Sequence, residues 1–176
     1  MEIPGMKSRP EEEEQASFFD YLAGQMRDHP WLIVAHAVPN GGARPSRTVM
    51  RRGKMCRVSV EGQKLKRQGL RKGVPDVSIP APRGPYHGLY IEFKRMPYLD
   101  AAGHRVKESL SPEQRAYGRW LCALGYLVVT CYGKDPAIRV LMNYIALPPG
   151  PGADYSLFKD PEFLTVTKMR LTVRGA

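Results

Sequence analysis

Hydrophobic side chains recur at helical spacing in three stretches of the chain. The stretches are residues 11–27, residues 112–124 and residues 135–146. The first begins after Pro10 with four glutamates, which favour the positive end of a helix dipole. Ser111 is the expected N-cap of the second, and Pro112 suits its first position. Its apolar stripe consists of Tyr117, Trp120, Leu121 and Leu124, and the first three are expected to be core.

Short apolar runs with strand character separate these helices. They are residues 31–38 (WLIVAHAV), 74–79, 89–94 and 126–132 (YLVVTCY). The prolines and glycines of residues 80–88 fit a turn between the second run and the third. The order helix, strand, strand, strand, helix, strand, helix predicts an α/β fold with a mixed sheet flanked by helices.

Residues 44–72 have no clear apolar face and carry the positive charge of the chain. They contain eleven Lys or Arg residues and one acid, Glu61, so their excess equals the net charge of the whole chain, +10. Such a run is often only a solvated segment. Because this one directly precedes Asp76, we interpret it as an exposed hairpin or mobile arm that contacts DNA phosphates. The expected contacts are Arg44, Arg47, Arg51, Arg52, Lys54, Lys66, Arg67, Arg71 and Lys72.

Three charged residues lie on the two strands that follow. Glu92 and Lys94 are two residues apart and share a face of their strand, whereas Phe93 points to the other face. If the two strands are antiparallel neighbours, Asp76 converges on Glu92. Two carboxylates suit Mg²⁺ or Mn²⁺, and Lys94 stabilises phosphate charge, as phosphodiester hydrolysis requires. The alternative is the solvated face of an edge strand, where a Glu–Lys pair contributes roughly 0–1 kcal/mol.

An ordered series of motifs favours the catalytic alternative. The motifs are an acidic run ending in Gln15, VPNGG (38–42), GVPD (73–76), IEFK (91–94) and LSPEQ (110–114), before a helix and a YLVV strand. The series resembles the VRR-NUC branch of the PD-(D/E)xK nucleases, of the stand-alone phage or bacterial type, over residues 11–146. The resemblance implies a restriction-endonuclease-like αβββαβ core. It also implies metal-dependent DNA cleavage by a homodimer that acts on branched DNA, such as four-way junctions and flaps.

The resemblance also implies a role for each matching residue in the IEFK and GVPD motifs. Asp76 and Glu92 are the implied ligands of Mg²⁺ or Mn²⁺, and the main-chain carbonyl of Phe93 is a third. Lys94 is implied to activate water or to stabilise charge. No other cofactor is expected.

Three further positions follow from the same resemblance. Gln114 is implied to contact the site or the DNA backbone, and Asn40 to touch the substrate. The first-helix acid, a possible further metal ligand, is Glu11 or Glu14. A Glu followed four residues later by Gln15 favours Glu11.

The boundaries and setting of the domain complete the expectations. Residues 1–147 are the expected nuclease domain, with the basic insertion at about 44–72, and residues 148–176 a Pro/Gly linker and a β-like extension. A non-catalytic or partner-dependent DNA-binding module of the same fold is the alternative function. The polar, acidic N-terminus and the lack of an apolar run of about 20 residues predict a protein of the cytoplasm of a bacterial or phage-infected cell, with no membrane role.

Cysteine and histidine contribute little to the expected chemistry. Cys56, Cys122 and Cys131 form no CxxC pair, so neither a disulfide framework nor a zinc site is indicated. His36 lies in an apolar run and is expected to be a hydrogen-bonded core residue outside the metal site.

Overall fold

A four-stranded sheet forms the centre of the fold. The computed structural model of the chain describes residues 10–39, 47–51, 53–99 and 102–159. The strands, in spatial order, are β1 (His36–Ala37), β4 (Val77–Ile79), β5 (Leu89–Lys94) and β8 (Leu127–Tyr132). The pairs β1/β4 and β4/β5 are antiparallel, and β5/β8 is parallel. The predicted mixed sheet is therefore confirmed, as is the antiparallel pairing that brings Asp76 next to β5.

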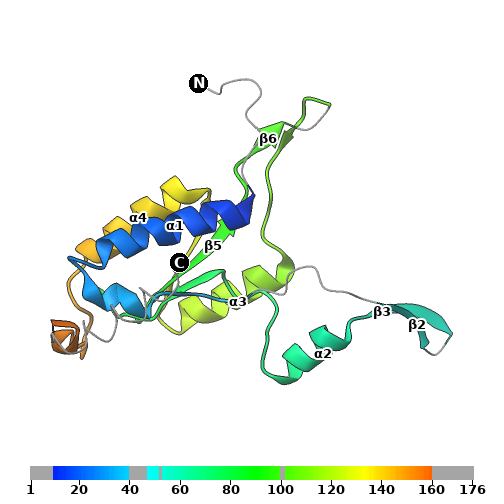
Figure 1. Cartoon of the computed structure of the whole chain (residues 1–176), viewed down its shortest axis with the longest axis horizontal. Helices are drawn as coiled ribbons and strands as arrows, with labels where there is room; N and C mark the ends of the chain where they lie inside the picture. Colours follow the sequence, from blue (N-terminus) through cyan, green and yellow to red (C-terminus); the bar gives the residue numbers. More distant parts are fainter. Residues whose placement is uncertain (1–9, 40–46, 52, 100–101, 160–176) are drawn as a thin grey trace, which may run out of the picture.

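Helices cover both faces of this sheet (Figure 1). The helices α1 (Glu11–Gln25) and α4 (Lys134–Ala146) pack on one face, and α3 (Pro112–Ala123) packs on the other. The alternation of β5 assigns Phe93 to the first face, where its ring lies 5.6 Å from that of Phe18, and turns Glu92 toward α3. The apolar core thus lies under α1 and α4, and the face under α3 is left for polar side chains.

The first predicted strand is mostly wrong. Residues 30–34 form a 3₁₀ helix, η1 (Pro30–Val34), and only His36–Ala37 pair with β4. Pro30 opens η1, and the turn buries Trp31 and Leu32 in the core. An apolar run of this length does not distinguish a strand from a buried turn, because both bury the same residues.

The basic segment contains a hairpin and a helix. The predicted hairpin is confirmed as β2 (Arg47–Arg51) and β3 (Lys54–Val58). It leads into α2 (Val60–Arg67), which the sequence analysis did not predict. Ser59 caps α2 by accepting a hydrogen bond from the Gly62 amide at 3.1 Å. A second hairpin consists of β6 (Tyr98–Leu99) and β7 (Arg105–Val106).

The apolar stripe of α3 is only partly buried. Leu121 is 7% exposed, but Trp120 is 63% exposed, so its expected place in the core is wrong. Leu124, at the end of the stripe, is also 63% exposed. Gly118 and Leu121 face the sheet, and the opposite side of α3 has no described element packed over it.

Residues 147–159 lie against the core. The Gly84 amide donates to the Pro148 carbonyl at 2.8 Å, and the Gly150 amide donates to the Pro82 carbonyl at 2.9 Å. The segment ends in a second 3₁₀ helix, η2 (Ser156–Lys159). The expected β-like extension after residue 159 lies outside the described residues. Within the described part of the chain, no helix is long and apolar enough to cross a bilayer.

Candidate functional site

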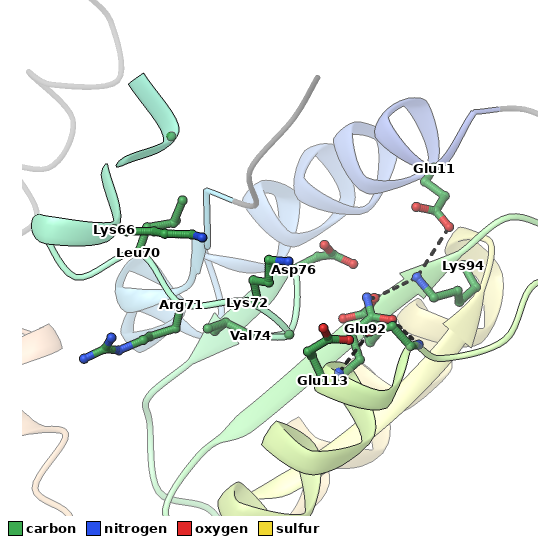
Figure 2. Close-up of a pocket in the computed structure, with 14 residues that line it drawn as sticks. Glu11, Lys66, Leu70, Arg71, Lys72, Val74, Asp76, Glu92, Lys94 and Glu113 are labelled. Atoms are coloured by element: carbon green, nitrogen blue, oxygen red, sulfur yellow. Dashed lines mark hydrogen bonds and ion pairs between the residues drawn. The ribbon is translucent and has the colours of Figure 1, made fainter. Parts of the chain in front are cut away.

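A cleft of about 500 Å³ opens beside β5. The first turns of α1 and α3 line it, together with the segment that runs from α2 to β4. Figure 2 shows Asp76, Glu92 and Lys94 close together at one side, with Lys66 and Arg71 on the opposite side. The charged and amide side chains of the lining are Glu11, Lys66, Arg71, Lys72, Asp76, Glu92, Lys94, Glu113 and Gln114.

Glu92 is the buried carboxylate of the cleft. It is 2% exposed, and its Oε1 atom accepts hydrogen bonds from Lys94 Nζ, at 2.7 Å, and from Gln114 Nε2. Its Oε2 atom is buried and has no hydrogen-bond partner among the described residues. Burial raises the pKa of Glu92 to about 7, and the charge of Asp76 adds to the rise against the opposing effect of Lys94. A cation at Oε2 would supply the interaction that this oxygen lacks.

Lys94 connects the acids of the cleft. Its Nζ atom donates to Glu92 and to the Phe93 carbonyl at 3.0 Å, and it lies 3.6 Å from Glu11 Oε1. Burial lowers the pKa of Lys94, but the hydrogen bond and charge of Glu92, with the charges of Glu11 and Asp76, outweigh it and raise the net value. Lys94 is therefore a cation at neutral pH.

Asp76 is fixed immediately before β4. Its Oδ2 atom accepts a hydrogen bond from the Phe93 amide at 2.7 Å, and its own carbonyl accepts one from the Val38 amide at 2.8 Å. The residue is thus tied to β5 through its side chain and to the chain after β1 through its backbone. These bonds hold the Asp76 carboxylate beside Glu92.

The two candidate acids of the first helix have different environments. Glu11 lines the cleft, and its Oε1 atom accepts from the Arg95 amide at 3.1 Å. Burial raises the pKa of Glu11, and Glu108 raises it further against the charge of Lys94. Glu14 instead is buried away from the cleft, and its Oε2 atom accepts from the Lys134 amide at 2.7 Å. Glu14 therefore caps the first turn of α4, whose N-cap residue, Gly133, offers no side chain.

We expect Glu14→Ala to lower the free energy of unfolding by about 1–2 kcal/mol, because the first turn of α4 loses its carboxylate partner. The exposed neighbour Glu13→Ala is the matched control and should cost less than about 0.5 kcal/mol. Urea denaturation of both variants measures the difference. Equal stabilities would contradict the capping role.

Gln114 joins the N-terminus of α3 to Glu92. Its Oε1 atom accepts from the Ser111 amide at 2.9 Å, and Ser111 Oγ accepts from the Gln114 amide at 3.1 Å, which completes a capping box. The remaining Nε2 group donates to Glu92. The cap predicted at Ser111 is confirmed, and it also orients the amide that holds Glu92.

Gly73 is a positioning residue that the sequence analysis did not identify. Its backbone has a φ of +81°, and an added Cβ would lie 2.4 Å from the Glu113 carbonyl carbon and 2.7 Å from the Gln114 amide nitrogen. The chain after α2 therefore packs directly on the first turn of α3. A glycine after a basic run was the available signal, but its neighbour could not be inferred from the sequence.

The predicted DNA-contact residues are distributed over three places. Lys66, Arg71 and Lys72 line the cleft, whereas Arg67 is exposed on α2 outside it. The backbones of Arg47, Arg51 and Lys54 belong to the β2–β3 hairpin. Asn40, Arg44 and Arg52, which are also predicted to contact DNA, lie outside the described residues.

His36 is exposed on β1, so its expected place in the core is wrong. Its Nδ1 atom lies 3.0 Å from the Val34 carbonyl, and the residue is absent from the lining of the cleft. The short β1 strand is at the edge of the sheet, which leaves His36 open to solvent.

A second groove adjoins the cleft at Glu92 and Gln114. It has a volume of about 450 Å³ and runs between α3 and β8, past Thr130. Arg115 and Arg119 line it together with apolar side chains. The groove therefore extends the cleft along a second, partly basic path.

The raised pKa of Glu92 predicts a pH-dependent stability in protein stripped of divalent ions with EDTA. The folded pKa of about 7 lies above the unfolded value of 4.5, so the folded state favours the protonated acid. Protonated Glu92 therefore contributes about 3 kcal/mol to the free energy of unfolding. This contribution is fully present below pH 4.5 and is lost as the pH rises to 7. Urea unfolding from pH 4.5 to 7.5 should show this decline in the free energy of unfolding of wild type and a flatter profile in Glu92→Gln. Parallel profiles of the two proteins would contradict the raised pKa of Glu92.

Comparison with known proteins assigns the fold. No family model and no curated protein matches the sequence. A solved structure named "VRR_NUC domain protein" superimposes with a TM-score of 0.59 and 27% sequence identity, over 84% of this chain and 97% of that one. This similarity confirms the resemblance to the VRR-NUC family that the motifs predict. The fold class predicted from the motifs, a restriction-endonuclease-like α/β core, is confirmed.

The name of this neighbour indicates a nuclease-type domain. The cleft beside β5 contains the residues of the GVPD, IEFK and LSPEQ motifs. The cleft combines carboxylates, the buried ammonium group of Lys94 and a basic wall formed by Lys66, Arg71 and Lys72. These are the chemical groups from which a nuclease mechanism is built.

Proposed function

We propose that this VRR-NUC domain is a divalent-metal-dependent endonuclease that hydrolyses phosphodiester bonds in branched DNA, including four-way junctions and flaps. The observation that carries the proposal is the Oε2 atom of Glu92, a buried carboxylate oxygen without a partner, beside Asp76 and Lys94 in one cleft. A buried acid left in this state is costly to ionise, and a divalent cation offsets that cost.

The donor atoms fit Mg²⁺ or Mn²⁺. Asp76, immediately before β4, and Glu92 and the Phe93 carbonyl, on the neighbouring strand β5, offer hard oxygen ligands. No group of three or more His, Cys, Asp or Glu suited to a metal ion is found in the described part of the chain. Water and a substrate phosphate are therefore the remaining ligands, as Mg²⁺ prefers. Glu11 then acts on Lys94 and Arg95 and does not join the metal ligands.

Each protein group has a separate task in the proposed reaction. Asp76, Glu92 and the Phe93 carbonyl would hold the divalent ion, which when bound would supply polarisation of the phosphate and a lower pKa of water. Lys94, a cation held by Glu92 and the Phe93 carbonyl, stabilises the negative charge that grows on the phosphate. Gln114, fixed by its capping box, holds Glu92 Oε1, which leaves Oε2 directed to the cation.

The basic wall opposite these groups supports DNA as the substrate. Lys66, Arg71 and Lys72 can neutralise phosphates next to the scissile bond, and Arg115 and Arg119 extend this charge along the adjoining groove. Contacts of this kind give affinity that falls steeply with salt and carries little sequence preference. The homodimer is also proposed, with Trp120 and Leu124 as exposed apolar residues available for the contact.

The test is a cleavage panel of duplex, flap, fork and four-way junction DNA with Mg²⁺, with Mn²⁺ and with EDTA. We expect cuts in branched substrates with either ion and none with EDTA. Solution mass, measured in parallel, should correspond to two chains. Equal cutting of duplex and junction would contradict the proposed selectivity for branched DNA. Cutting in EDTA would contradict the proposed dependence on a divalent metal.

A further inference from the structure

Two methionines form an exposed apolar pair at the end of the β2–β3 hairpin. Met50 is 71% exposed and Met55 is 68% exposed. They are direct partners across the antiparallel pair, next to the turn closed by Arg51 and Lys54. Partner side chains lie about 5 Å apart, so the two thioethers make one continuous surface. A contiguous exposed apolar pair at the tip of a hairpin is available for contact with a partner.

The hairpin projects from the rest of the molecule. Figure 1 shows β2 and β3 at one end of the molecule, separated from the central sheet by α2. The core thus does not explain the methionines, because no described element packs over Met50 or Met55.

Charge identifies the partner. The hairpin lies in the segment 44–72, which holds eleven basic residues and one acid, so the surface that it meets is strongly negative. That surface must also offer an apolar face to the methionines. DNA offers both where its bases are unstacked, and Met is among the residues that proteins insert between base steps. A continuous duplex offers its phosphates but keeps its base faces covered.

We propose that Met50 and Met55 insert against unstacked bases at the branch point of the DNA that the cleft cuts. The proposal rests on the proposed function and deepens it, because it names what distinguishes a branched substrate from duplex. The helix α2 connects the hairpin to Lys66 in the cleft and is about 12 Å long for its eight residues. The cut is therefore expected several nucleotides away from the branch point.

The test measures base unstacking without cleavage. A four-way junction carries 2-aminopurine next to the branch point, and a linear duplex carries it at a matched position, both in EDTA. Wild type should raise the fluorescence of the junction. The double variant Met50→Gln/Met55→Gln should lose the rise and bind the junction about tenfold more weakly, with less than about a twofold change on duplex. The control Met50→Leu/Met55→Leu keeps apolar side chains and should behave as wild type.

Two results would overturn the proposal. One is an unchanged fluorescence rise and junction affinity in the Gln variant. The other is a Gln variant with a changed mass in solution but an unchanged rise in fluorescence for each bound protein. That result would assign the methionines to a contact between two copies of the chain. This test is separate from the test of the nuclease function. If the protein cuts no substrate but still needs the methionines to unstack bases, only the proposed cleavage is contradicted.

Discussion

Glu92→Gln is expected to reduce cleavage of a four-way junction by at least about 1000-fold, equivalent to about 4 kcal/mol of barrier. Gln fills the same space, so the core under β5 is kept. It removes the charge that would hold the proposed cation, and it replaces one of the two carboxylate oxygens with an amide group that donates hydrogen bonds and cannot bind a cation. Single-turnover rates with Mn²⁺ at saturating protein measure the loss apart from binding.

The matched control is Glu12→Gln, which removes one exposed carboxylate from α1. It should change the rate less than about twofold, because surface substitutions of this kind have small effects. Junction affinity in EDTA should be similar in wild type and in both variants. A Glu92→Gln protein that cuts at the wild-type rate would exclude this cleft as the active site.

Gly73→Ala is expected to lower both stability and turnover. An L side chain at a φ of +81° is strained, and its Cβ would lie 2.4 Å from backbone of α3 that cannot move alone. We expect the free energy of unfolding to fall by about 2–4 kcal/mol. The cleavage rate should fall by at least about tenfold, since the shift moves Gln114 away from Glu92.

Gly103→Ala separates the two causes of this loss. Gly103 has nearly the same backbone angle, +80°, but an added Cβ meets no atom within 4 Å in the described part of the chain, its chain neighbours apart. Its substitution should cost about 1 kcal/mol through strain alone and leave cleavage unchanged. Urea unfolding and single-turnover rates of the two variants are the measurements. Equal losses of stability and rate would show that the contact with α3 is unimportant.

Local patterns of the sequence contain much of the site. The alternation of β5 gives Glu92, Phe93 and Lys94 their faces because side chains along a strand alternate whatever the tertiary fold. The capping box at Ser111 is equally local, since all its bonds join residues three positions apart.

Contacts between distant segments could not be inferred in this way. The spacing to Gln15 favours Glu11 but leaves Glu14 open, and only the fold separates the two, because the first turn of α4 lies beside Glu14. The closeness of Gly73 to α3 depends on how the chain after α2 returns to the sheet. The helical stripe predicts a core position for Trp120, which is exposed. The prediction fails because a stripe does not indicate how much of it a neighbouring element covers.

The central claim is that Asp76 and Glu92 bind a divalent ion, and Mn²⁺ binding measured by electron paramagnetic resonance of the free ion tests it most directly. We expect wild type and Glu14→Ala to bind Mn²⁺ with the same affinity in the absence of DNA. Asp76→Asn and Glu92→Gln should each weaken this binding by about tenfold or more, as the loss of one carboxylate ligand predicts. Mn²⁺ binding of the same strength in all four proteins would contradict the account.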